Sequence, residues 1–170
     1  MRTLARLLMT MAVGAALWQA APARATWTIA AVDSRTGDVG AAGAGCVDAD
    51  LVAVAGLVPG SGAVAAQAAY LERGRDLGVQ LVGQGKTPTQ IMTALTAPSF
   101  DVDIAKRQYG VATVDAAGAF TGSKVEKWSG DRNGGGPGGS VVVIVDAAGD
   151  AEVARSAYDA FQTTDRGPCT

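Results

Sequence analysis

The sequence predicts an α+β domain in which strands and helices form separate packed layers. Strand-like segments come first, two helical segments follow, and further strands precede a closing helix. Blocks of this kind favour layers over alternating βαβ units. Hydrophobic residues make up 48% of the 170 residues, which supports one domain with a packed core. The sequence shows no repeat with a period of about 20–50 residues, which argues against a solenoid.

The N-terminus has the features of a secretory signal peptide. Two arginines precede a mostly apolar run over residues 7–21, and a small-x-small cleavage motif ends at Ala25. The apolar run is shorter than the roughly 20 residues that span a bilayer. We therefore expect a signal peptide over residues 1–25 and an exported domain over residues 26–170, periplasmic or secreted, with no stable membrane span after processing. An uncleaved membrane anchor is the alternative.

Four strand-like segments precede the first helix. Residues 26–33 and 38–45 are predicted to be strands joined by a turn. Residues 51–58 form a continuous apolar run, which predicts a strand buried on both faces. A proline-glycine turn then leads into a short strand over residues 63–67.

Two helices are predicted next. Leucines at helical spacings predict the first over residues 68–84, with Gly85 as its stop. Thr87, Pro88 and Gln90 have the pattern of an N-cap, a proline at the first helical position and a capping-box glutamine. A short second helix therefore begins there.

The last third of the sequence returns to strands. Residues 107–115 and 118–123 are predicted strands, and the glycine-rich residues 129–139 are predicted to be a linker or hairpin loop. The run SVVVIVD over residues 140–146 predicts a strand, and residues 150–162 predict a closing helix that begins at an aspartate N-cap.

The composition excludes several classes of function. The chain has no histidine, which rules out a Ser-His-Asp triad, a Cys-His pair and a His-ligated metal site. The net charge of −2 gives no basic surface for nucleic acid. We expect neither a metal nor another cofactor.

Three charged or glycine-rich motifs have structural interpretations. Residues 83–87, GQGKT, resemble a phosphate-binding loop, but Gln80 stands where its first glycine belongs and a helix precedes it. Asp101 and Asp103 lack further ligands at calcium-loop spacing, so a solvated turn is expected. The alternating charges of residues 124–127 suit an exposed strand or its edge.

The two cysteines leave two interpretations open. Cys46 and Cys169 form a disulfide in the exported chain, or they remain two free thiols. Their spacing excludes a C-x-x-C redox motif.

Thr26 is the candidate catalytic residue. Cleavage after Ala25 would give Thr26 a free α-amine, whose ordinary pKa is about 7.7–8.0. Such a residue carries a nucleophilic hydroxyl and a base together and needs no histidine. The alternative is a threonine that simply favours the first strand.

The motifs together resemble one known family. TWTIAAVD followed by TGDVG, then LVPG, GAVAAQA, RQYGVATVDAAG and FTG, are similar to the DUF1028 family over roughly residues 26–130. That family is grouped with the N-terminal nucleophile (Ntn) hydrolases. The resemblance implies an αββα sandwich of two antiparallel sheets. It also implies Thr26 as nucleophile, hydrolysing an amide of an unknown small-molecule or peptide substrate through an ester intermediate.

The chain also departs from the family pattern. It is shorter after Trp128, so the C-terminal part of the sandwich is expected to be abbreviated, and no lysine lies between Thr26 and residue 85. Asp33, Gln67 or Arg107 would then support Thr26, unless each makes only a structural hydrogen bond or salt bridge. A non-catalytic exported binding or structural module is the alternative function, and a homo-oligomer remains open.

Overall fold

The computed structural model describes residues 25–46, 50–136, 138–148 and 150–163. The predicted signal peptide therefore lies outside the described residues, apart from Ala25. Within the described residues, no helix is both long and apolar enough to cross a membrane.

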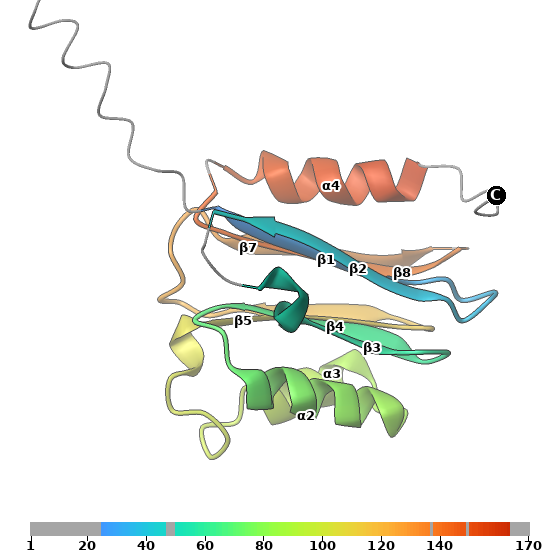
Figure 1. Cartoon of the computed structure of the whole chain (residues 1–170), viewed down its shortest axis with the longest axis horizontal. Helices are drawn as coiled ribbons and strands as arrows, with labels where there is room; N and C mark the ends of the chain where they lie inside the picture. Colours follow the sequence, from blue (N-terminus) through green and yellow to red (C-terminus); the bar gives the residue numbers. More distant parts are fainter. Residues whose placement is uncertain (1–24, 47–49, 137, 149, 164–170) are drawn as a thin grey trace, which may run out of the picture.

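Two four-stranded antiparallel sheets stack face to face (Figure 1). The β1 sheet has the order β2-β1-β8-β7, and the β4 sheet has the order β3-β4-β5-β6. The strands are β1 (Thr26–Val32), β2 (Val39–Gly45), β3 (Ala55–Val58), β4 (Gly62–Ala68), β5 (Arg107–Thr113), β6 (Ala117–Thr121), β7 (Gly130–Gly136) and β8 (Gly139–Asp146). The predicted strands over residues 26–33, 38–45, 63–67, 107–115, 118–123 and 140–146 are confirmed to within about two residues.

Helices cover the outer face of each sheet, which completes the αββα layer order (Figure 1). The helices α2 (Glu72–Gly83) and α3 (Pro88–Leu95) lie on the β4 sheet, and α4 (Glu152–Thr163) lies on the β1 sheet. The short helical turns are η1 (Leu51–Val54) and η2 (Ile104–Lys106). The predicted α+β sandwich is therefore present.

Local capping explains where two helices begin. The Thr87 side chain accepts a hydrogen bond from the Gln90 main-chain N–H (3.3 Å), and the Gln90 side chain accepts one from the Thr87 N–H (3.0 Å). The predicted capping box is confirmed. Asp150 likewise accepts the main-chain N–H of Glu152 (2.8 Å) at the start of α4. The first predicted helix starts later than residue 68, because residues 62–68 continue β4.

The core between the sheets consists of small side chains. Its buried residues are Ala30, Val32, Ala63, Ala65, Ala112, Val142 and Ile144. Gly110 allows this close approach, because a Cβ atom there would lie 3.0 Å from the Val142 side chain. Small residues in this layer let the two sheets pack tightly and hold their ends in fixed positions.

The strand predicted over residues 51–58 is only partly correct, and the loop predicted over residues 129–139 is wrong. Residues 55–58 form β3, but as an edge strand with Leu57 47% exposed and not as a strand buried on both faces. Residues 51–54 form η1, because the Asp50 side chain accepts the Val52 N–H (3.0 Å) and caps a helical turn. The glycine-rich segment predicted as a loop is largely β7, paired with β8 from Gly130↔Val145 to Gly136↔Gly139. The ladder with the fully buried strand β8 runs through these glycines, so main-chain pairing extends the strand where there are no side chains.

Two predictions about charged residues were also wrong. Residues 124–127 lie in the loop between β6 and β7 and not on a strand. Asp101 is not solvated: it is only 3% exposed, and its Oδ2 accepts the Nε–H of Arg107 at 2.7 Å. Desolvation of Asp101 is offset by this ion pair.

Candidate functional site

Thr26 begins β1, a central strand, and its side chain faces the space between the sheets. It pairs with Gly45 of β2 and with Asp146 of β8. Thr26 is 8% exposed and is therefore buried, although it is the first residue of the strand. Gly45 makes room for it, because a Cβ atom there would lie 3.0 Å from Thr26 Oγ1.

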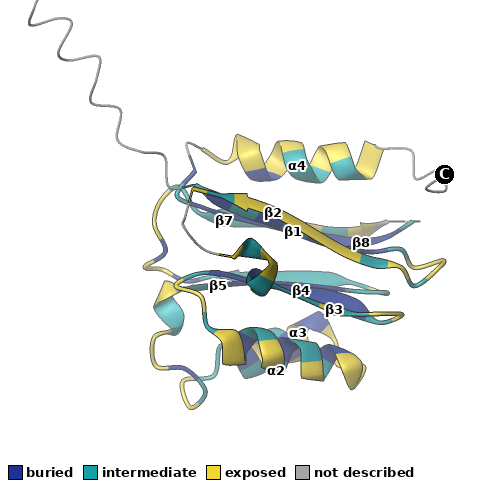
Figure 2. Cartoon of the chain, in the orientation of Figure 1, coloured by how far each residue is buried: buried dark blue, intermediate teal, exposed yellow. Residues whose placement is uncertain are grey.

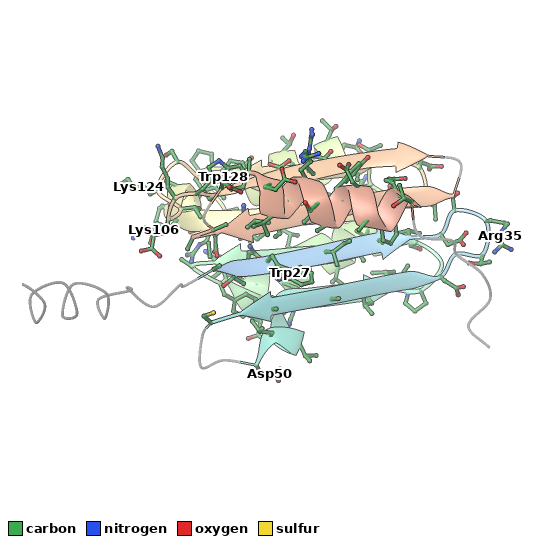
Figure 3. The ribbon with its side chains drawn as sticks, turned by 90° about the horizontal axis from the view of Figure 1, so that it is seen from above. Trp27, Arg35, Asp50, Lys106, Lys124 and Trp128 are labelled. Atoms are coloured by element: carbon green, nitrogen blue, oxygen red, sulfur yellow. The ribbon has the colours of Figure 1, made fainter. Side chains whose placement is uncertain are left out.

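A cavity of about 360 Å³ opens at this end of the sandwich. Its walls come from the start of β1, the end of β4, η2, the loop after β6 and the end of β8. The lining residues are Thr26, Ala68, Ala69, Lys106, Lys124, Val125, Glu126, Asp146 and Ala147. Figure 3 shows Lys106 and Lys124 at the end where β1 begins, whereas Arg35 lies at the opposite end.

Asp146 is the carboxylate that faces Thr26. The main-chain N–H of Thr26 donates a hydrogen bond to Asp146 Oδ1 at 3.2 Å. Burial raises the pKa of Asp146 above its ordinary value, while hydrogen bonds from the Thr26 main chain and hydroxyl oppose that rise. One buried carboxylate therefore contacts both groups that an N-terminal threonine would use.

A buried amide network fixes the main chain of Thr26. The Nε2 of Gln67 donates to the Thr26 carbonyl (3.4 Å) and to Gln108 Oε1 (2.8 Å). Thr28 Oγ1 donates to Gln67 Oε1 (2.7 Å). The Nε2 of Gln108 donates to the Val145 carbonyl (3.0 Å) and so ties β5 to β8. Hydrogen bonding of both amides compensates for their burial.

Two alanines with left-handed main chains line the cavity. Ala68 has φ 66° and Ala147 has φ 50°. This conformation costs a residue with a Cβ atom about 1–2 kcal/mol. Such strain concentrates at functional sites. Both residues directly adjoin residues that contact Thr26, namely Gln67 and Asp146.

The three predicted supporting residues fall in different places. Gln67 contacts Thr26 directly. Arg107 lies at the start of β5, where its guanidinium binds Asp101 and donates to the Ala69 carbonyl in the cavity wall. This pairing raises the pKa of Arg107 and lowers that of Asp101.

Asp33 lies at the far end of β1. It is seven positions after Thr26 in the sequence, a span of about 23 Å in a strand. Its Oδ1 accepts the main-chain N–H groups of Arg35 (2.7 Å) and Thr36 (3.1 Å) in the β1–β2 turn. The structure does not bring Asp33 to the cavity.

Sequence reasoning missed the residues that complete the site. These are Asp146, Gln108, Lys106, Lys124 and Glu126. The aspartate that ends the apolar run SVVVIVD was the one available signal, because it stops a buried strand with a charge. Lys106 belongs to η2 and Lys124 to the loop after β6, both far from Thr26 in sequence, so no local pattern around Thr26 indicated them.

The described residues offer little for a metal or a disulfide. Among them, no group of three or more His, Cys, Asp and Glu side chains could hold a metal ion. Cys46 follows β2 and is exposed as a free thiol. Cys169, its predicted partner, lies outside the described residues.

Comparisons with known proteins place the chain in a family. A model of the "Family of unknown function (DUF1028)" matches residues 26–169, well past the predicted limit near residue 130. The crystal structure of protein SPO2555 from Silicibacter pomeroyi, also of DUF1028, is similar with a TM-score of 0.73 and 26% identity. That match covers 83% of this chain but 61% of the other, so this chain spans about three fifths of its length. No curated protein matches. The chain belongs to DUF1028, a family of unknown function.

Proposed function

We propose that this chain is an exported amide hydrolase whose nucleophile is Thr26, freed as the N-terminal residue by removal of residues 1–25. The observation that carries the proposal is the position of Thr26 in the cavity, with its main-chain nitrogen and its hydroxyl both facing buried Asp146. Two further facts support it. The family match begins at Thr26, and the αββα layers are those that the Ntn resemblance implies.

The chemistry follows from the two groups of an N-terminal threonine. The free amine accepts the hydroxyl proton, directly or through a water molecule, as Oγ1 attacks the substrate's amide carbonyl. The tetrahedral intermediate then collapses, the C–N bond breaks, and the proton passes to the leaving amine. Water attacks the resulting Thr26 ester, returns the hydroxyl proton and releases the acid.

Asp146 has a positioning and charge-stabilising role in this scheme. The amine becomes positive when it takes the hydroxyl proton, and the carboxylate already accepts a hydrogen bond from that nitrogen. An adjacent negative charge stabilises the ammonium form in a buried setting. Gln67 donates a hydrogen bond to the carbonyl of Thr26 and so fixes that end of the residue. The nitrogen and hydroxyl of Thr26 can then face Asp146 while the strand stays in place.

The two lysines supply positive charge to the cavity. Lys106 and Lys124 line the same cavity as the nucleophile, and Lys106 Nζ is held by Asp103 Oδ1 at 2.8 Å. Positive groups near a reacting carbonyl favour the negative charge that develops on its oxygen.

N-terminal sequencing of the exported chain tests whether removal of residues 1–25 makes Thr26 the N-terminal residue. We expect the chain to start at Thr26. A β-lactone or epoxyketone probe should then form an adduct on Thr26 in the wild-type chain and none in Thr26→Ala. A chain that starts at another residue has no free amine on Thr26, and that result would overturn the proposal.

The low exposure of Thr26 favours a second candidate, an exported binding module that keeps the fold without catalysis. Only 8% of the residue is accessible, which restricts an approaching amide. Resistance of a chain that begins at Thr26 to both probes and to a broad panel of amides would make the binding module the better account.

A further inference from the structure

A row of polar side chains crosses the β4 sheet next to the cavity. Thr121 of β6, Gln108 of β5 and Gln67 of β4 are opposite one another in the strand register. Gln108 Nε2 donates a hydrogen bond to Thr121 Oγ1 (2.8 Å), and Gln67 Nε2 donates one to Gln108 Oε1 (2.8 Å). Gln67 immediately precedes Ala68, which lines the cavity. Side chains therefore join three neighbouring strands of this sheet at the cavity end.

The same row also reaches three strands of the β1 sheet. Gln67 Nε2 donates to the Thr26 carbonyl of β1 at 3.4 Å. Gln108 Nε2 donates to the Val145 carbonyl of β8 (3.0 Å) and to the Gly130 carbonyl of β7 (3.1 Å). Val145 immediately precedes the carboxylate that faces Thr26. The two glutamines thus connect the main chain of the proposed nucleophile with the main chain that carries its carboxylate.

Buried polar side chains are concentrated at this end of the sandwich. Both glutamines are almost inaccessible, at 2% for Gln67 and 0% for Gln108, on strands that Figure 2 shows as mostly buried. Seven polar residues are buried in the described part of the chain. Five of them belong to one hydrogen-bonded cluster, namely Thr26, Thr28, Gln67, Gln108 and Asp146. The cluster therefore gathers most of the buried polar groups around the nucleophile.

Stability alone does not require a pair of glutamines at this position. Replacing both partners of a buried hydrogen bond by apolar groups of the same shape can leave stability nearly unchanged. The core cluster between the sheets is made of alanine, valine and isoleucine side chains. Apolar contacts have no preferred direction, whereas a fully hydrogen-bonded polar network holds its members in one arrangement. The amides are therefore suited to fixing positions that apolar packing would leave less defined.

We infer that Gln108 is a positioning residue for the reaction at Thr26, an inference that rests on the proposed function. Gln108 is not among the residues that line the cavity. It acts through Gln67 on the main chain of Thr26, and through Val145 on the strand that carries Asp146. Its amide sets the spacing between the nucleophile and the carboxylate. A misplacement of about 1 Å in reacting groups can slow a reaction about 10²-fold.

Labelling kinetics of the variant Gln108→Met test this role. Chains that begin at Thr26 are treated with a β-lactone at several concentrations, which separates the binding constant of the probe from the maximum rate of adduct formation. Gln108→Met keeps the length of the side chain and removes the amide. We expect the maximum rate to fall at least about tenfold and the binding constant to stay within about twofold, because only the positioning of Thr26 changes. Circular dichroism verifies that the variant is folded.

Ser140→Ala is the matched control at the other end of the same strands. Ser140 of β8 is buried, and its hydroxyl donates to the Thr113 carbonyl of β5, so it also ties β8 to β5. Its loss should leave the labelling rate within about twofold. Equal slowing in Ser140→Ala and Gln108→Met, or an unchanged maximum rate in Gln108→Met beside a labelled wild type, would overturn this inference alone. A wild-type chain without any adduct on Thr26 would overturn the proposed function and this inference with it.

A second variant, Gln108→Glu, decides the question even where Gln108→Met does not fold. When protonated, its carboxyl can donate to the Val145 carbonyl and accept from Gln67 as the amide does, whereas the ionised form has no donor. Burial and the nearby Asp146 carboxylate raise the pKa of such a carboxyl. The labelling rate relative to the wild type at the same pH should therefore fall as the pH rises, and titration of the Thr26 amine cancels in this ratio. A ratio independent of pH in a folded chain would contradict the positioning role.

Discussion

Both ends of the sandwich contain residues with left-handed main chains, but the two ends place different amino acids at those positions. At the hairpin end, the left-handed positions are glycines, Gly37 (φ 75°) and Gly60 (φ 76°). The Gly60 N–H donates to the Gly37 carbonyl at 3.0 Å, which ties two turns together. At the cavity end the left-handed residues are alanines, Ala68 and Ala147, and a buried carboxylate lies between charged loops.

This difference separates positions shaped by stability from positions shaped by the site. Glycine adopts positive φ without the penalty of about 1–2 kcal/mol that a Cβ atom brings. The hairpin end uses it, and Asp33 closes the turn there with two main-chain hydrogen bonds. At the cavity end, Ala68 and Ala147 keep strained main chains, and the Asp146 carboxylate is buried away from water. Changes at the cavity end should therefore affect reactivity, and changes at the hairpin end should affect stability alone.

The largest effect is expected at Thr26. Thr26→Val keeps the shape of the side chain and removes the hydroxyl, so adduct formation with a β-lactone should fall at least about 10³-fold. Thr26→Ser keeps the hydroxyl and should remain reactive. Intact-mass spectrometry of chains beginning at residue 26 measures both rates. Equal labelling of the valine variant and the wild type would show that the Thr26 hydroxyl is not the reactive group, and would contradict the assignment of reactivity to the cavity end.

The next largest effect is on stability, at Arg107. Arg107→Ala leaves Asp101 buried without its cation and should lower the free energy of unfolding by about 3 kcal/mol in urea denaturation. Arg155→Ala breaks an exposed pair with Glu152 and should cost less than about 0.5 kcal/mol.

The Asp101 pair also has a defined pH dependence. Arg107 lowers the folded-state pKa of Asp101 below its ordinary value. The stabilisation is therefore complete above the ordinary carboxyl pKa and is lost as the pH falls through the lowered one. In Arg107→Ala, the free energy of unfolding should fall less steeply as the pH is lowered. A pH dependence of stability equal to that of the wild type would contradict a stabilising role for the Asp101–Arg107 pair.

A moderate effect on reactivity is expected at Asp146. Asp146→Asn removes the charge beside the Thr26 nitrogen and should slow labelling about tenfold, the scale of one charge-assisted hydrogen bond. Asp33→Asn at the hairpin end is the matched control and should leave the labelling rate within about twofold, the scatter expected of a surface turn change of a few tenths of a kcal/mol. Equal slowing in both variants would contradict the distinction between the ends.

Asp146 should also make the uncleaved chain sensitive to pH in the opposite sense from Asp101. Burial raises its folded-state pKa, so ionising it costs the folded chain more than the unfolded chain. Stability should fall as the pH rises from the ordinary carboxyl pKa through the raised one. Thermal unfolding of uncleaved Asp146→Asn should lack this fall.

The smallest effects compare the left-handed residues directly. Ala68→Gly should relieve strain and stabilise the chain by about 0.5 kcal/mol, after the entropy cost of glycine. Gly60→Ala should destabilise by about 1 kcal/mol through conformation alone, because no atom lies within 4 Å of a Cβ atom there. Chemical denaturation measures both, and destabilisation by Ala68→Gly would show that no strain is stored at the cavity.

Local patterns predicted most of the fold but only part of the site. The β1–β2 hairpin and the Thr87 capping box depend on residues close in sequence, and both were predictable. Contact between Thr26 and Asp146 depends on pairing of β1 with β8, which are 120 residues apart at that point. The β7 strand is held by main-chain bonds to β8, so its glycines gave no sign of it.

The most direct test of the central claim compares two chains that differ by one residue. One chain begins at Thr26, and the other begins at Ala25 and so turns the Thr26 nitrogen into an amide. Both are treated with the same epoxyketone, and adducts are located by peptide mass spectrometry. The account predicts an adduct on Thr26 in the first chain and none in the second. Equal modification of both chains, or no modification of the first, would contradict it.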